Sequence, residues 1–145
     1  MDRPSVQAVI YDADKGTILL IRKHNSVRDE LVWRLVKGGV AEGETGPEAM
    51  RREIAEEVGL RDVSVLEKVY YYEFQHMDLR HLVSVYLVEA DMDEAVTLQG
   101  ETEEESAIVD HAWLPPEEAR ETLYWEHEKR SVKAATALLE KRKKR

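Results

Sequence analysis

GGVAEGETGPEAMRREIAEEVGL, residues 38–60 of the chain, predicts a glycine turn that runs into a helix. Thr45 and Glu48 have the spacing of a capping box, in which each side chain bonds to the backbone N–H of the other residue at a helix start. Pro47 is tolerated in the first turn, because its missing N–H would lack a helical partner there anyway. Gly59 favours a stop, since glycine readily takes the left-handed conformation just past a helix end.

The predicted helix has an acidic face beside an apolar one. At about 100° per residue, Glu53, Glu56 and Glu57 fall within an arc of about 100°. Such close like charges repel one another, and Arg52 alone cannot neutralise them. Clustered carboxylates suit a hard divalent cation such as Mg2+ or Mn2+. A solvated acidic helix face is the alternative. The adjoining stripe, which we expect to face a core, consists of Met50, Ile54 and Val58.

The whole stretch resembles the Nudix box, GX5EX7REUXEEXGU with U aliphatic, at every defined position. These positions are Gly38, Glu44, Arg52, Glu53, Ile54, Glu56, Glu57, Gly59 and Leu60. Resemblance to the Nudix hydrolases implies an α+β fold, the Nudix α/β/α sandwich with a mixed β-sheet between helices. It also implies metal-dependent hydrolysis of a phosphoanhydride, the diphosphate bond in a nucleoside diphosphate linked to another moiety.

The resemblance further implies roles for individual side chains. The three glutamates of the acidic face would hold Mg2+, or alternatively Mn2+, together with the backbone carbonyl of Gly38 or an immediate neighbour. Arg52 would orient the glutamates, and Glu44 would brace Arg52. Many Nudix enzymes add one more carboxylate from a distant loop as metal ligand or general base. The acidic stretch 91–105 offers Glu101, Glu103, Glu104 and Glu105 for this role, and a solvated loop is the alternative.

Residues outside the helix indicate how a substrate is held. The lead-in WRLVKG, residues 33–38, resembles the WXXPKG sequence of diadenosine and diphosphoinositol polyphosphate hydrolases, with Val36 in place of the proline. The basic pair at 22–23 could instead be simply exposed to solvent and bind no phosphate. The aromatic cluster at 70–74 could instead pack within its strand and bind no nucleobase. The cations that could contact a phosphate chain are Lys37, Arg22, Lys23 and Arg34. The rings that could stack on a nucleobase are Tyr70, Tyr72 and Phe74.

Composition limits the classes of protein to which the chain can belong. Its 145 residues are enough for one domain with a real core, and we expect residues 1–145 to form a single domain. The absence of cysteine excludes disulfides and thiolate metal sites. No apolar run reaches membrane-spanning length, and the N-terminus lacks the apolar core of a signal peptide. We therefore expect a cytoplasmic protein that makes no membrane contact.

The net charge of −9 is unevenly distributed, because residues 141–145 are all basic. The rest of the chain is more acidic still. An acidic surface binds nucleic acid poorly, since phosphate contacts dominate that affinity. We therefore expect a small-molecule nucleotide as the binding partner, and a monomer or a homodimer.

Strands and helices mix around the box without a regular βαβ pattern, which supports an α+β class. We expect a hairpin of strands at 5–11 and 17–23, a short strand at 31–36, a strand at 62–67 that continues after a bend at 69–74, a strand at 80–89, and a last strand at 108–114. A short helix should open at residues 115–118. A long helix should start at residue 124, with a buried side of Val132, Ala135, Leu138 and Leu139.

The sequence favours one substrate class and leaves others open. The lead-in, the cations and the aromatic residues together favour a dinucleoside polyphosphate such as diadenosine tetraphosphate. A nucleoside triphosphate pyrophosphatase and an ADP-ribose pyrophosphatase are the nearest alternatives, because both need the same metal site. A catalytically inactive Nudix-fold binding module is a more remote one, since such proteins usually carry a degraded box and this box is complete.

Overall fold

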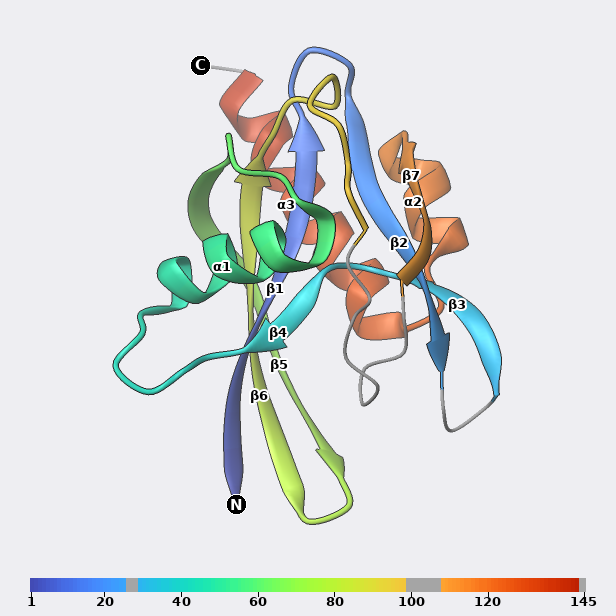
Figure 1. Ribbon diagram of the computed structural model, residues 1–145. Helices are drawn as coiled ribbons and strands as arrows, with labels where there is room; N and C mark the ends of the chain where they lie inside the picture. Colours follow the sequence, from blue (N-terminus) through green and yellow to red (C-terminus); the bar gives the residue numbers. More distant parts are fainter. Residues whose placement is uncertain (26–28, 99–107, 144–145) are drawn as a thin grey trace.

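A mixed β-sheet with helices on both faces organises the chain (Figure 1). The computed structural model describes residues 1–25, 29–98 and 108–143. Helix α1 covers one face of the sheet, and α2 and α3 cover the other, which confirms the predicted α+β sandwich. The strands within the described residues are β1 (Asp2–Asp12), β2 (Thr17–Asn25), β3 (Glu30–Arg34), β4 (Lys37–Gly39), β5 (Ser64–His76), β6 (Leu79–Glu89) and β7 (Ile108–Leu114). The helices there are α1 (Gly46–Val58), α2 (Pro116–Thr122) and α3 (Glu126–Lys143).

Strand β1 changes its neighbour along its length, and this places the start of the box. One edge of β1 runs parallel to β6. On the other edge, its first half pairs antiparallel with β4, through Ser5 with Gly39 and Gln7 with Lys37, whereas its end pairs with β2. The remaining pairs, β2 with β3, β2 with β7 and β5 with β6, are antiparallel. The lead-in to the box is therefore held inside the sheet.

The two faces of β1 contribute to two separate cores, which explains its nearly continuous apolar sequence. Toward α1, the alternating side chains of β1 meet the apolar stripe of the helix, and the residues involved are Val6, Ala8, Ile10, Met50, Ile54 and Val58. Toward α3, the core includes Val9, Val83, Val85, Leu87, Val132 and Ala135. Leu138 and Leu139 pack against this second core, so the predicted buried side of the last helix is confirmed.

The predicted boundaries of α1 are confirmed by its hydrogen bonds. Thr45 Oγ1 accepts from the Glu48 N–H at 3.2 Å, and Glu48 Oε1 accepts from the Thr45 N–H at 2.9 Å. Gly59 ends the helix with φ of 72°, and its N–H donates to the Ala55 carbonyl. Met50, a member of the predicted apolar stripe, has no exposed surface. Local chemistry therefore fixes both ends of this helix and its inward face.

Several strand boundaries differ from those expected. The strand predicted at 31–36 ends at Arg34, and residues 37–39 form β4 where a turn was expected. The strand predicted at 62–67 does continue through 69–74, as β5, but it begins at Ser64 and its pairing with β6 shifts register on either side of Lys68. Helix α3 begins at Glu126, two residues later than expected. Each difference arises from pairing between distant segments, which local patterns do not specify.

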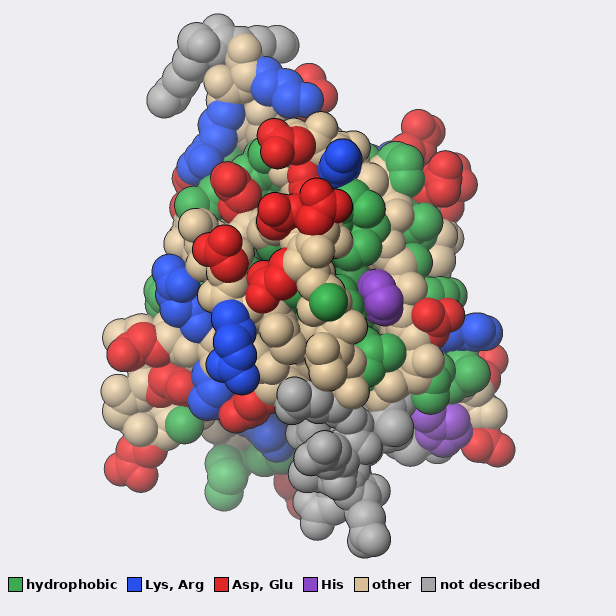
Figure 2. All heavy atoms as spheres, turned by 45° about the horizontal axis from the view of Figure 1, so that its top comes forward, with side chains coloured by type: hydrophobic (Ala, Val, Ile, Leu, Met, Phe, Trp, Pro, Cys, Tyr) green, Lys and Arg blue, Asp and Glu red, His purple; other side chains and the backbone are tan. Residues whose placement is uncertain are grey.

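Acidic side chains gather where β1 ends, around the β1–β2 turn and the end of β6 (Figure 2). A shallow cavity of about 250 Å3 there is lined by Asp12, Asp14, Asp62, Glu89 and Asp91. Backbone N–H groups of Asp14, Lys15 and Met92 donate to the Asp12 carboxylate, and these bonds lower its pKa.

No helix in the described part of the chain is both long and apolar enough to cross a membrane.

Candidate active site

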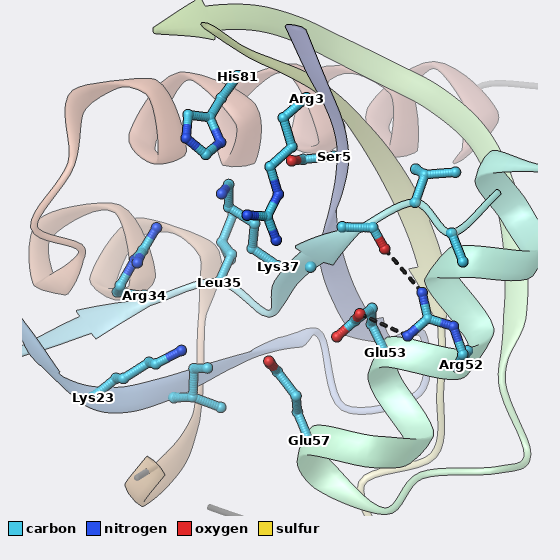
Figure 3. Close-up of a pocket in the computed structure, with 15 residues that line it drawn as sticks. Arg3, Ser5, Lys23, Arg34, Leu35, Lys37, Arg52, Glu53, Glu57 and His81 are labelled. Atoms are coloured by element: carbon cyan, nitrogen blue, oxygen red, sulfur yellow. Dashed lines mark hydrogen bonds and ion pairs between the residues drawn. The ribbon is translucent and has the colours of Figure 1, made fainter. Parts of the chain in front are cut away.

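A cavity of about 480 Å3 opens where β4, the beginning of β1 and helix α1 meet (Figure 3). One wall is acidic and comes from α1, with Glu53 bonded to the guanidinium of Arg52 and Glu57 further along the helix. The facing wall is basic and comes from the strands. Its ionisable members are Arg3, Lys23, Arg34, Lys37 and His81. The cavity can therefore hold a molecule that meets carboxylates on one side and cations on the other.

Arg52 connects the acidic wall to the loop before the helix. Its Nε and one terminal nitrogen donate to both carboxylate oxygens of Glu44, at 2.8 and 2.9 Å. The same terminal nitrogen donates to the Gly39 carbonyl at 2.9 Å. The other terminal nitrogen donates to Glu53 at 2.8 Å and to Glu56 at 3.2 Å. One guanidinium thus fixes the loop, β4 and the acidic face together, as its planar set of five donors permits.

The Arg52–Glu44 pair is electrostatically strong. Hydrogen bonds from Arg52 and then from the Ala41 backbone N–H lower the pKa of Glu44 to about 2, from an ordinary value of 4.5. The hydrogen bonds from Arg52 to Glu44, and then to Glu53, raise the pKa of Arg52. Glu44 therefore stays ionised through the neutral range and keeps Arg52 in place.

The three glutamates of the box occupy different environments. Glu57 is buried with 8% of its surface exposed, and Glu53 lies beside it in the cavity. Glu56, whose side chain is 58% exposed, is turned toward Arg52 and does not line the cavity. A Cβ on Gly38 would overlap the Glu53 carboxylate, so only glycine leaves room for that side chain. The box glycine and the first glutamate are thus sterically coupled.

The donor set suits a hard divalent cation. As the side chains lie, no three Asp, Glu or His groups in the described residues are close enough to hold one ion. Mg2+ commonly binds through one or two carboxylates and completes its shell with water and substrate phosphates. Glu53 and Glu57 supply such a pair, and the backbone of Gly38 and Gly39 in β4 lines the same cavity. These residues therefore fit the metal that the box implies.

The basic wall is organised around Lys37 and a buried glutamate. Burial, and then the charge of Arg34, lower the pKa of Lys37 to about 8. Glu128, from the first turn of α3, is 1% exposed. Its carboxylate accepts from the Leu35 backbone N–H at 2.7 Å and from Arg34 at 3.3 Å. The charge of Arg34 opposes the rise in the pKa of Glu128 that burial causes. Helix α3 thus anchors the lead-in to the box.

Four of the proposed substrate residues lie outside the cavity. Arg22 packs over the Trp33 ring, with its guanidinium carbon 5.8 Å from the ring centroid. Tyr72 is buried, donates to Gln7 at 2.7 Å and stacks on His127 at 4.4 Å. The aromatic residues predicted as a stacking surface thus pack on the α3 side of the sheet, and none lines the cavity. These are Tyr70, Tyr72 and Phe74, of which Phe74 lies behind the cavity-lining Lys37, whose Nζ is 5.3 Å from the ring centroid.

Two cavity residues were missed by the sequence analysis, namely Arg3 and His81. They are register partners across the parallel β1–β6 pair, so both project from the same face of the sheet. His81 stacks on Phe74 at 4.5 Å, with 2° between the ring planes. No local pattern marks either residue, because the signal is the pairing of two strands that lie far apart in sequence. The proposed extra carboxylates lie outside the described residues, at Glu101, Glu103, Glu104 and Glu105.

Known proteins resemble this chain in sequence and in fold. The RNA pyrophosphohydrolase of Helicobacter pylori (strain G27) is 34% identical over 64 residues, which are 44% of this chain and 41% of that protein. The RNA pyrophosphohydrolase of Baumannia cicadellinicola subsp. Homalodisca coagulata is 37% identical over 83 residues, 54% of this chain and 49% of that protein. The chain therefore spans less than half the length of these two curated relatives.

A solved structure of a C. elegans Ap4A hydrolase binary complex superimposes with a TM-score of 0.78. It covers 94% of this chain and 97% of that chain at 19% identity, a likeness that shows the fold. The NUDIX domain family matches residues 1–135. The chain belongs to the Nudix family, as the box predicts.

Proposed function

We propose that this chain is a Nudix phosphoanhydride hydrolase that requires a divalent metal and cleaves the diphosphate bond of a nucleoside diphosphate linked to another moiety. The observation that carries the proposal is the two-sided cavity. Its acidic wall presents Glu53 and Glu57, and its basic wall presents Lys37 and Arg34 about the same space. A phosphate chain bridged to carboxylates by a metal ion satisfies both walls at once.

Each side chain then has a distinct task. Glu53 and Glu57 would hold the cation, and Glu56 would join them when it leaves Arg52. A bound divalent cation activates water and neutralises charge on the phosphate oxygens. Arg52 keeps Glu53 oriented, while Glu44 keeps Arg52 ionised and in place. A glutamate of the box or of residues 101–105 would accept the proton of the attacking water.

Among substrates, we propose a dinucleoside polyphosphate such as diadenosine tetraphosphate. The lead-in at residues 33–38 supports it, and so do Lys23, Arg34 and Lys37, which extend the cationic wall beyond a single diphosphate. The fold of the C. elegans Ap4A hydrolase is compatible. The three rings expected to stack on adenine do not line the cavity, so they give this substrate no support.

One panel of substrates tests these proposals. Diadenosine tetraphosphate, ADP-ribose, the common nucleoside triphosphates, 5′-triphosphorylated and capped RNA, and diphosphoinositol phosphates are each assayed with Mg2+ and with Mn2+. We expect the tetraphosphate to have the highest kcat/KM and Glu57→Gln to abolish turnover of every substrate. A triphosphate, RNA or ADP-ribose that leads about tenfold overturns the substrate assignment. Full activity in excess EDTA overturns the metal-dependent reaction itself.

Other properties follow from the same proposal. Mg2+ is the expected metal, and Mn2+ is the alternative that the panel distinguishes. A catalytically inactive binding module is the remaining alternative, and turnover of any substrate in the panel eliminates it. We also propose a single domain, a cytoplasmic location and a monomeric or homodimeric state, which limited proteolysis, fractionation and light scattering test.

A further inference from the structure

Arg3 projects into the basic half of the cavity from the beginning of β1. It is paired in register with His81, and both residues line the cavity with Lys37. A Cβ on Gly39 would lie 3.3 Å from an Arg3 guanidinium nitrogen, so the side chain folds across β4 toward the acidic wall. The guanidinium therefore lies at the exposed mouth of the cavity, where a ligand can reach it.

The acidic groups near Arg3 are engaged elsewhere. Asp2, its neighbour in sequence, forms a two-bond pair with Arg80, at 3.0 and 3.1 Å. Glu128 is committed to Arg34 and to the Leu35 N–H. Among the described residues, no hydrogen bond or ion pair involves the Arg3 guanidinium. Arg3 thus adds to this wall a positive charge that no carboxylate of the described residues pairs with.

The field in this half of the cavity is positive. The cations Arg3, Lys23, Arg34 and Lys37 all line this half, whereas the carboxylates that line the cavity, Glu53 and Glu57, come from the α1 wall. Like charges held together in a concave site attract an anion. Two guanidiniums and an ammonium offer more donors than a neutral sugar could use, and their geometry suits phosphate oxygens.

We propose that Arg3 and Lys37 form an anion subsite for a phosphate group beyond the two that flank the cleaved bond. The inference rests on the proposed function and deepens it, because it makes Arg3 a determinant of specificity. Substrates with three or more phosphates fill the subsite. A substrate whose second half is joined through only two phosphates, such as ADP-ribose, leaves it empty.

A binding experiment without metal separates the subsite from catalysis. Inorganic tripolyphosphate is titrated calorimetrically into the protein in excess EDTA, at low and at moderate salt. We expect binding that weakens with salt and that Arg3→Gln weakens about tenfold or more, the size of one charged hydrogen bond. Arg80→Gln is the matched control, because Arg80 lies on the adjacent strand and pairs with Asp2 outside the cavity. It should stay within about twofold of the parent protein.

Kinetics supply the second measurement. Arg3→Gln should raise KM for the tetraphosphate with little change in kcat, leave ADP-ribose kinetics unaltered, and be partly rescued by Arg3→Lys. Two results would contradict the subsite even if the protein is a hydrolase. Either tripolyphosphate does not bind the parent protein, or Arg3→Gln and Arg80→Gln weaken its binding equally. If the protein hydrolyses nothing yet Arg3→Gln alone loses tripolyphosphate binding, the subsite stands and the proposed reaction fails.

Discussion

The carboxylate of Glu53 occupies the space that a side chain at position 38 would need. Gly38→Ala should therefore displace Glu53 from the cavity and from Arg52. We expect turnover to fall about as far as in Glu53→Gln. The free energy of unfolding should fall by only about 1 kcal/mol, because the end of a glutamate can move to a less favourable rotamer. Steady-state kinetics and urea denaturation measure the two effects.

A double-mutant cycle checks that the two residues act together. If Gly38→Ala acts through Glu53, then combining it with Glu53→Gln should lower turnover no further than either change alone. Additive losses would mean that the alanine disturbs β4 itself, and the steric link would then be of no functional consequence.

The Arg52–Glu44 pair predicts a specific dependence of stability on pH. The pKa of Glu44 is about 2 in the folded protein against an ordinary 4.5, so folding favours the ionised form. The stabilisation is fully present above about pH 4.5 and is lost as the pH falls toward 2. The difference in unfolding free energy between the parent and Glu44→Gln should therefore shrink across that window. Denaturant titrations at a series of pH values measure it.

Arg52→Lys provides the complementary test of this pair. Lysine keeps the charge but cannot form the two-bond fork or reach Gly39 and Glu53 at the same time. We expect the pH-dependent difference to become smaller in the Arg52→Lys background. A Glu44→Gln effect that is constant from pH 2 to 7 would show that the pair does not control ionisation of Glu44.

Removing charge from the acidic wall should have opposite effects with and without metal. Without metal, Glu57→Gln relieves repulsion on the α1 face and should raise unfolding free energy by a few tenths of a kcal/mol. Added Mg2+ should stabilise the parent, by about 2.7 kcal/mol at 100 times its Kd, and leave the variant nearly unchanged. Thermal denaturation in EDTA and in Mg2+ measures both. Equal Mg2+ shifts in the two proteins would place the ion elsewhere.

The part of the site that could be predicted is the part encoded locally. The capping box at Thr45 and Glu48, the stop at Gly59 and the inward stripe of α1 all follow from spacing within one helix, and the structure contains them. The spacing also puts Glu53 and Glu57 on one side of the helix. It does not indicate that Glu56 faces Arg52, because that depends on where β4 and the Glu44 loop lie.

The part that could not be predicted depends on pairing between distant segments. Arg3 and His81 meet because β1 and β6 are parallel neighbours in one particular register. The register of β5 and the position of α3 decide that Tyr72 packs on His127 and not on a ligand. A single sequence carries no record of these pairings. A strand of alternating aromatic residues reads the same whether it faces a helix or a cavity.

Glu128 offers the sharpest test of how α3 supports the site. Its carboxylate accepts from the Leu35 N–H across 93 residues of sequence, and it also accepts from Arg34. Glu128→Ala leaves a buried N–H without a partner and Arg34 without its carboxylate, so we expect a loss of about 3 kcal/mol or more in unfolding free energy. Glu128→Gln keeps an acceptor for the Leu35 N–H and should therefore lower the unfolding free energy by less than Glu128→Ala does. Glu126→Ala is the matched control, because Glu126 is exposed on the same turn and, within the described residues, its one ion pair is with Arg130 at 3.8 Å. This change should lower the unfolding free energy by under about 0.5 kcal/mol. Guanidinium denaturation of the three variants measures the order. Equal losses for Glu126→Ala and Glu128→Ala would show that the buried carboxylate does not anchor the lead-in.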